Sequence, residues 1–180
     1  MALCDAAQLE LRLRHYTQRR WRPAGGYRRG MGAEASEYKV RQRVGKDMRI
    51  VDIMKRRVAT IEMDDTLETV HEIFAAAPFH HLLVIEEGQL VGILSDKDLY
   101  KALSPYLGSS SENQRDRDTL QRRVHQVMTR QPVTVSPEVS VSQACELLLA
   151  KGISCLPVLE NGQIVGIVTW RDLLQARCQP

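Results

Sequence analysis

Short apolar runs separated by turn residues predict two β-hairpins. Residues 82–85 and 89–94 flank Glu87 and Gly88, and a second pair of apolar runs flanks Asn161 and Gly162. An Asn-Gly pair between two such runs is a strong local signal for a two-residue hairpin turn. A helical pattern lies before and after each hairpin, so the chain alternates between the strand and helix periods.

The helix before each hairpin has a recognisable start. Asp65 is followed three residues later by Glu68, and Ser140 by Gln143. Both pairs have the spacing of a capping box. Gly152 is placed to end the second of these helices, because glycine readily takes the left-handed conformation of a C-terminal cap.

Both helices carry an apolar stripe wider than one sheet requires. Between residues 141 and 150 only Ser142, Gln143 and Glu146 are polar. A helix that lies on a single sheet buries a stripe about 100° wide. We therefore expect two buried faces, one against the helix's own sheet and one against a helix of the other half of the chain or of a second chain.

These elements belong to two copies of one unit. Residues 51–100 align with residues 125–174 without a gap, and 15 of the 50 aligned pairs are identical. Each copy opens with a short helical lead (50–55; 120–128) and a strand (59–61; 133–135), which the helix, the hairpin and a last helix follow. The repeat predicts an α+β fold with the order β-α-β-β-α, twice.

A heptad present in both copies marks the start of the last helix. Residues 92–98 read Gly-Ile-Leu-Ser-Asp-Lys-Asp, and residues 166–172 read Gly-Ile-Val-Thr-Trp-Arg-Asp. Ser95 with Asp98, and Thr169 with Asp172, have the spacing of a capping box. The free amides of a helix N-terminus also suit a phosphate. The heptad is therefore either a cap alone or a cap that also holds the anionic end of a ligand.

Composition is that of an ordinary folded protein, with 43% hydrophobic and 26% charged residues. No apolar run approaches the ~20 residues that span a bilayer, and the first residues lack the basic and apolar regions of a signal peptide. The four cysteines show no Cys-x-x-Cys spacing, and Cys145 and Cys155 lie in apolar patterns typical of buried thiols. We expect a reduced, cytoplasmic protein without a membrane partner.

Residues 1–47 differ from the rest. Residues 1–46 hold 11 Lys and Arg against 4 Asp and Glu, a net charge of +7, whereas the whole chain carries +3. Without a lasting period, this segment predicts a disordered basic tail. Three other interpretations stay open: an upstream extension with Met48 as the true start, a mitochondrial transit segment, and an arm for nucleic acid or anionic membrane with aromatic residues among its arginines.

The repeat divides the remainder into a first domain (48–103), a linker with a lead-in helix (104–124) and a second domain (125–178). Ser, Pro and Gly in residues 104–113 predict a flexible connector. Charges of both signs in residues 115–123 predict a solvent-exposed helix that leads into the second domain.

The two copies resemble a pair of CBS domains, named after cystathionine β-synthase and together called a Bateman module. The resemblance rests on residues 51–54, 59–61, 81–84 and 91–98 of the first copy, and 127–129, 132–135, 155–158 and 165–172 of the second. It covers about residues 48–178, and the whole chain is most similar to stand-alone bacterial proteins of this type. The resemblance implies two repeats packed through their sheets as a pseudo-twofold pair, and a homodimer of such pairs.

The resemblance also implies an adenosine-containing ligand (AMP, ADP, ATP or S-adenosylmethionine) in clefts between the repeats. The family's ribose-binding aspartate is matched by Asp98 and Asp172, and its phosphate-facing hydroxyl by Ser95 and Thr169. Lys97 and Arg171 would lie beside the phosphate. The remaining implied contacts come from the first strand and the start of the second: Thr60, Ile61, His81, Thr134, Val135, Ile153, Cys155 and Pro157.

The Thr169 and Asp172 site is predicted to be the better of the two. The first copy has Asp96 where the second has Trp170, and this additional negative charge opposes an anionic ligand. The adjacent His80 and His81 point to opposite faces of a strand and cannot bind one metal ion together. We expect His81 to be a hydrogen-bonded structural histidine, and no metal site.

No phosphate loop, His-Glu-x-x-His sequence or nucleophile elbow is present. The sequence therefore predicts a regulatory protein rather than an enzyme, without a covalent cofactor. It would sense an adenine nucleotide and signal to an unidentified enzyme or transporter. Two alternatives stay open: a ligand-free dimerisation scaffold, and a protein that binds nucleic acid through its basic tail, the less favoured partner.

Overall fold

The computed structural model describes residues 48–178, and the predictions for the basic tail lie outside the described residues. The first half contains α2 (Ile50–Ile53), β1 (Thr60–Glu62), α3 (Leu67–Ala76), β2 (His81–Glu86), β3 (Gln89–Ser95) and α4 (Asp96–Ala102). The second half contains α5 (Gln114–Asp118), the 3₁₀ turns η1 (Thr119–Gln121) and η2 (Val124–Gln126), β4 (Thr129–Arg130), α6 (Val141–Lys151), β5 (Cys155–Glu160), β6 (Gln163–Thr169) and α7 (Trp170–Cys178). The predicted α+β fold is confirmed.

Both hairpins form as the sequence predicts. Glu87 and Gly88 have φ values of 48° and 77°, and Asn161 and Gly162 have 50° and 79°, so each turn uses two left-handed residues. The registers pair His81 with Ser95 in one hairpin and Cys155 with Thr169 in the other. The hydroxyl residue of each repeated heptad therefore ends its hairpin directly before the last helix.

One of the predicted helix caps is wrong by one residue. The α3 helix is capped by Thr66, whose Oγ1 accepts a hydrogen bond from the amide of Thr69 at 3.3 Å. Asp65 instead accepts a bond from the amide of Glu62 at 2.9 Å and closes the turn before the helix. The capping box of Ser140 and Gln143 is confirmed, and Gly152, at φ 63°, ends α6.

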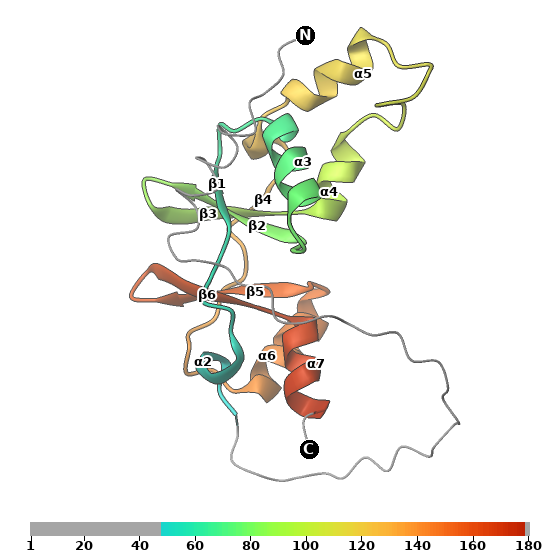
Figure 1. Cartoon of the computed structure of the whole chain (residues 1–180). Coiled ribbons are helices and arrows are strands. Elements are labelled where there is room, and N and C mark those ends of the chain that lie inside the picture. The colour runs from blue at the N-terminus through green and yellow to red at the C-terminus, as the bar shows by residue number, and fades with distance from the viewer. Residues whose placement is uncertain (1–47, 179–180) are drawn as a thin grey trace, which may run out of the picture. The chain divides into compact units, whose positions relative to one another are not determined.

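The lead of each repeat packs on the other repeat. Ile50 of α2 is fully buried in a core with Val141 and Leu156, and its amide donates to the carbonyl of Val139 at 2.9 Å. Val124 of η2 is likewise buried in the core of the first repeat. In Figure 1, α2 lies beside α6 and α7 rather than beside the helices that follow it in sequence. Each of these hydrophobic cores therefore contains the lead of one repeat and the remaining elements of the other.

After these leads the chain runs beside the last strand of the other repeat. Thr129 of β4 pairs with Ile93 of β3, and Lys55 forms the equivalent antiparallel bridge with Ile167 of β6. The first sheet thus has the order β1-β2-β3-β4, with β1 parallel to β2 and the other pairs antiparallel. The second repeat thus supplies an edge strand to the first, and the first supplies a single bridge to the second.

The crossing leads account for the glycine that opens each heptad. A Cβ atom at Gly166 would lie 2.8 Å from Met54 Sδ and 3.0 Å from the Lys55 carbonyl oxygen. At Gly92 it would lie 2.5 Å from Met128 Sδ. Only a residue without a side chain lets the lead of the other repeat approach this closely.

The predicted strand over residues 133–135 is reduced to a single parallel bridge between Val135 and Val158. In the first repeat, the amide of Leu83 donates to the carbonyl of Ala59 at 3.1 Å. The equivalent position in the second repeat is Pro157, which has no N–H to donate. The missing bond leaves the first strand of the second repeat shorter than its counterpart.

The two repeats contact each other through their sheets, as the family resemblance implies. Leu83, Cys155 and Ile167 form a buried cluster with residues of both hairpins around it. The helices α3 and α4 cover the opposite side of one sheet, and α6 and α7 that of the other (Figure 1). Burial raises the pKa of the Cys155 thiol to about 12, so that this thiol stays protonated at neutral pH.

The linker is more closely held than its composition indicates. Residues 115–123 were expected to form one exposed helix, whereas α5 and η1 are short, and Asp116 is only 8% exposed. Its carboxylate accepts bonds from the Ser104 hydroxyl at 2.6 Å and the Asn113 amide at 2.8 Å. The hydroxyl and then the amide hold the pKa of Asp116 below its ordinary value.

The wide apolar stripe of α6 has one buried and one exposed face in this single chain. Val141, Ala144 and Leu148 are buried, whereas Leu149 is 83% exposed. On the neighbouring α7, Leu174 is 54% exposed. Among residues 48–178, no helix has the length and apolar character to cross a membrane.

Substitution of Gly166 tests the crossing of the leads. We expect Gly166→Ala to lower the free energy of unfolding by about 1–3 kcal/mol, because the new methyl group meets the Lys55 backbone, which cannot move aside. Gly92→Ala is the matched comparison and should cost less, because the nearest backbone atom, the Thr129 carbonyl oxygen, would lie 3.2 Å from the new methyl group rather than 3.0 Å. Urea unfolding measures both. Wild-type stability in Gly166→Ala would contradict the close approach.

Candidate functional site

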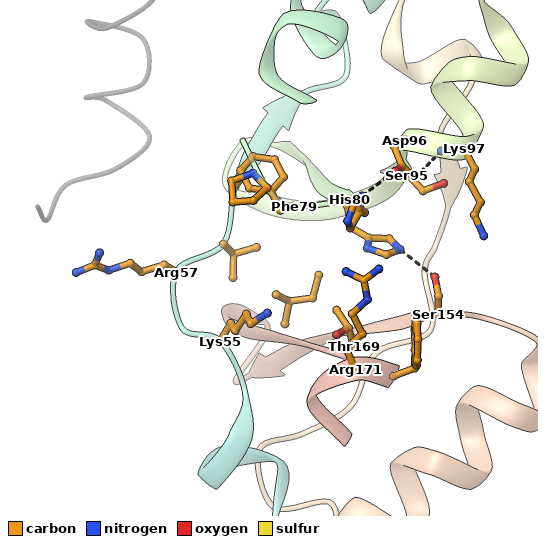
Figure 2. A pocket seen from close by; sticks show the side chains of 16 residues that line it. Lys55, Arg57, Phe79, His80, Ser95, Asp96, Lys97, Ser154, Thr169 and Arg171 are labelled. Carbon is orange, nitrogen blue, oxygen red and sulfur yellow. Dashed lines mark hydrogen bonds and ion pairs between the residues drawn. The ribbon is translucent and has the colours of Figure 1, made fainter. Parts of the chain in front are cut away.

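A cavity of about 330 Å³ lies between the two repeats. Its walls come from the segment before β1, the turn before β2, and the starts of α4 and α7 (Figure 2). The lining residues are Lys55, 57–59, 78–81, 95–97, Ser154, Ile167 and 169–171. The cavity therefore combines the lead of the first repeat with the heptad of the second.

Thr169 and Asp172 form the cap that the sequence predicts. The amide and the hydroxyl of Thr169 donate to Asp172 Oδ2 at 2.8 and 2.6 Å. Asp172 Oδ1 faces Lys55 Nζ at 3.1 Å. Thr169 and Lys55 line the cavity, and Asp172 lies directly behind them with 9% of its side chain exposed. The carboxylate is thereby held next to the cavity.

The first repeat contains the same cap at Ser95 and Asp98. The amide and the hydroxyl of Ser95 donate to Asp98 Oδ2 at 3.1 and 2.6 Å. Ser95 lines the cavity between the repeats, but Asp98 lies at a shallow surface depression with Lys101 and Arg122. The two capping boxes are thus alike in local geometry and different in surroundings.

Positive charge predominates around the cavity. Lys55, Arg57, Lys97 and Arg171 line it, and the acid among the lining residues, Asp96, is already paired with His80 Nδ1 at 2.8 Å. In Figure 2, Lys55 and Arg171 point into the cavity, whereas Arg57 points away from it. Cations thus outnumber carboxylates on the lining, which favours an anion in this space.

Two of the cavity's cations have no charged equivalent in the second repeat. The segment at the end of the first lead, residues 55–59, carries Lys55 and Arg57 on the same cavity as Thr169. The equivalent residues after the second lead are Thr129 and Gln131, which are uncharged. The Ser95 and Asp98 pair therefore lacks an equivalent of Lys55, although Lys101 and Arg122 lie at the same depression as Asp98.

Two aromatic and apolar surfaces lie beside the charged groups. Trp170, 47% exposed, has the Arg171 guanidinium carbon 5.5 Å from its ring centroid, within the range of a cation–π contact. Val58, Ala59 and Phe79 supply apolar wall from the first repeat. The cavity thus has a charged end and an apolar slot.

His81 joins the two repeats across the cavity. Its Nε2 is hydrogen-bonded to the hydroxyl of Ser154 at 2.9 Å. Burial is the main cause that lowers the pKa of His81, which therefore favours the neutral imidazole. His80 and His81 have different partners, and no cluster of three metal-binding side chains occurs in the described part of the chain.

The structure brings only part of the predicted site together. Thr169, Arg171, Ser95, Lys97 and His81 line one cavity, with Asp172 behind it. The remaining predicted residues are absent from its lining: Asp98, Thr60, Ile61, Thr134, Val135, Ile153, Cys155 and Pro157. Ile61, Val135 and Cys155 are buried in the cores, and contact of these backbones with a ligand stays a prediction.

The segment of residues 55–59 lines the cavity without having been predicted from the sequence. Lys55, Arg57, Val58 and Ala59 precede the strand from which the base contacts were predicted, and they reach the heptad of the other repeat only because the leads cross. Alignment of the copies already contained one usable signal, since Lys55 and Arg57 are charged and their partners in the second copy are not.

Comparison with known proteins agrees with this architecture. The model of the CBS domain matches residues 50–105 and again residues 124–178. The chain belongs to the CBS-domain family. The resemblance found in the sequence is thereby confirmed, and the cavity lies between two CBS domains.

Three relatives illustrate the match. A CBS domain-containing protein of Dictyostelium discoideum is 33% identical over 128 residues, which are 69% of this chain and 88% of that protein. The crystal structure of a CBS-domain containing protein from Agrobacterium tumefaciens is 25% identical, with a TM-score of 0.62, and covers 72% of this chain and 99% of its own. The CBS domain pair of protein MJ0100, in complex with 5′-methylthioadenosine and S-adenosyl-L-methionine, is 23% identical, with a TM-score of 0.60, over 73% of this chain and 96% of its own.

The contact between His81 and Ser154 predicts a pH dependence of stability. The pKa of His81 is lowered on folding, so the unfolded chain binds the proton more readily. The stability present above the ordinary histidine pKa of 6.5 is therefore lost as the pH falls below it. We expect the melting temperature of His81→Gln to fall less than that of wild type between about pH 7 and pH 5.

His71→Gln serves as the control, because this histidine is exposed on α3. Its pH profile should follow that of wild type. Parallel profiles for wild type and His81→Gln would show that protonation of His81 does not destabilise the folded protein.

Proposed function

We propose that this protein is a regulator whose CBS pair binds an adenosine-containing nucleotide in the cavity and signals its bound state to a partner protein. The observation that carries the proposal is the Thr169–Asp172 cap beside a cation-lined cavity. A phosphate would lie at the start of α7 beside Arg171, because the Thr169 hydroxyl already donates to Asp172 and the Trp170 amide to the Ser154 carbonyl. The ribose hydroxyls would donate to Asp172, whose Oδ1 is paired with Lys55 of the cavity lining.

The apolar slot suits the base. Val58, Ala59 and Phe79 form wall on the side of the first repeat, and Ile167 does so on the side of the second. The cavity volume of about 330 Å³ is at the lower end of the range typical of small-molecule sites. The complex of the MJ0100 CBS pair with 5′-methylthioadenosine and S-adenosyl-L-methionine supports an adenosine-containing ligand as the class to test.

Signalling follows from the position of the cavity. A ligand there would touch both repeats and the first lead, whose Lys55 is bridged to β6. If the ligand binds one arrangement of the repeats more tightly than another, it shifts the population towards that arrangement. A partner enzyme or transporter that contacts both repeats could then distinguish the bound from the free protein.

Substitution of Asp172 tests ligand binding. A nucleotide at 100 times its dissociation constant adds about 2.7 kcal/mol to the free energy of unfolding, which raises the melting temperature by a few degrees for a unit of this size. Asp172→Asn keeps the size of the side chain but removes its negative charge and replaces one acceptor oxygen with an NH₂ donor. We expect it to weaken AMP, ADP or ATP binding by about tenfold or more in calorimetric titration.

Asp98→Asn is the matched control, because it removes the same capping carboxylate from the first repeat, outside the cavity. It should lower basal stability similarly and leave nucleotide affinity near that of wild type. Equal affinities for the two variants, or no binding to wild type by any adenosine ligand, would contradict the proposed site.

We also propose that the protein self-associates, as expected of the dimerisation scaffold that was the alternative function. Leu149 on α6 and Leu174 on α7 leave an apolar surface on the helical side of the second repeat. The wide stripe of α6 is explained if a second copy covers this surface. A homodimer through these helices leaves the cavity between the repeats open to ligand.

Leu149→Glu tests the homodimer. A carboxylate in a desolvated apolar contact is unfavourable, so we expect the dimer to dissociate at concentrations at least about tenfold higher than wild type requires. Light scattering coupled to size-exclusion chromatography over a dilution series measures this. Tyr106→Glu, at an exposed aromatic residue of the linker, is the control. Unchanged association of Leu149→Glu would exclude this surface.

A further inference from the structure

Lys55 forms an ion pair with Asp172, the carboxylate that the proposed ligand would need. Its Nζ lies 3.1 Å from Asp172 Oδ1, while Asp172 Oδ2 accepts both the amide and the hydroxyl of Thr169. The oxygen that remains for a ribose hydroxyl is therefore the one that faces the lysine. In Figure 2 the Lys55 side chain points into the cavity from the lead of the first repeat.

The ion pair is suited to exchange. The Lys55 side chain is 64% exposed, whereas Asp172 is 9% exposed. An ion pair with so exposed a partner contributes little to stability. The backbone of Lys55 is fixed, because its amide and carbonyl are both bonded to Ile167 at 2.9 Å. Only the flexible four-carbon side chain has to move when a hydroxyl approaches Asp172.

The pseudo-equivalent residue shows that the fold itself does not require this lysine. Thr129 makes the same edge pairing with Ile93 that Lys55 makes with Ile167. Its side chain brings no charge to Asp98. Only the first repeat therefore has an ammonium group at this position, and it lies on the cavity that Arg171 also lines.

We propose that Lys55 is the residue that selects ligands by their phosphate charge, an inference that rests on the proposed nucleotide site. When the ribose hydroxyls take Asp172, the released ammonium turns to the phosphate chain. It also offsets the negative charge of Asp172, which would otherwise repel that chain. Both effects strengthen with each added phosphate and are absent for adenosine. The site then favours ATP and ADP over AMP, and disfavours the sulfonium cation of S-adenosylmethionine.

The test is a charge series measured on wild type and Lys55→Gln by calorimetric titration. The probes are adenosine, AMP, ADP, ATP and S-adenosylmethionine, without magnesium and at one ionic strength. For wild type we expect affinity to rise along the phosphate series. Lys55→Gln should lose about tenfold or more for ATP, the effect of one charge-assisted contact, and far less for adenosine. It should bind S-adenosylmethionine more tightly than wild type does.

Two further variants separate charge from structure. Lys55→Arg keeps the charge and should keep the preference for ATP over adenosine. Arg56→Gln removes a neighbouring exposed cation outside the cavity lining and should also keep it. If Lys55→Gln leaves the ratio of ATP affinity to adenosine affinity unchanged, this inference is overturned and the proposed function is not. A wild-type protein that binds none of the five probes overturns the proposed function and this inference with it.

Discussion

The fold depends on the close approach of each lead to the glycine that opens the heptad of the other repeat. Met54 and the carbonyl of Lys55 lie against Gly166, and Met128 lies against Gly92. This contact lets the lead pair with the last strand and bury Ile50 or Val124 in the opposite core. It also brings Lys55 to the heptad that contains Thr169 and Asp172. If the leads did not cross, the cavity would lose the wall formed by the segment 55–59 and the cation that is paired with Asp172.

Much of the local structure could be predicted, because it depends on neighbours in sequence. The hairpin at Asn161 and Gly162, the cap at Ser140 and the end of α6 at Gly152 each follow from a few adjacent residues. The cap of α3 was wrong because Asp65 and Thr66 are both suitable residues. The bond from Asp65 to the preceding turn leaves Thr66 to cap the helix.

The site was harder to predict, because its parts are distant in sequence. The two capping boxes were visible as repeated heptads, but the lead that faces each of them comes from the other repeat. Periodicity within one copy contains no information about that exchange. The shortened first strand of the second repeat was more accessible, since Pro157 lacks the N–H that Leu83 uses.

A duplicated fold here carries two sites that are no longer equivalent. Both heptads keep the hydroxyl and the carboxylate that cap a helix, so the local structure is preserved in each. The charged residues differ: Lys55 and Trp170 accompany the second heptad, and Thr129 and Asp96 the first. A structural requirement common to both copies thus coexists with ligand chemistry that we assign to one of them.

Hydrogen exchange measured by mass spectrometry, with and without saturating ATP, tests the central claim most directly. We expect simultaneous protection of residues 55–59, at the end of the first lead, and of residues 169–172 in the second heptad, because one ligand contacts both. Exchange in the second lead at residues 129–133 should stay unchanged. Protection of that second lead without the first, or of neither, would contradict the account.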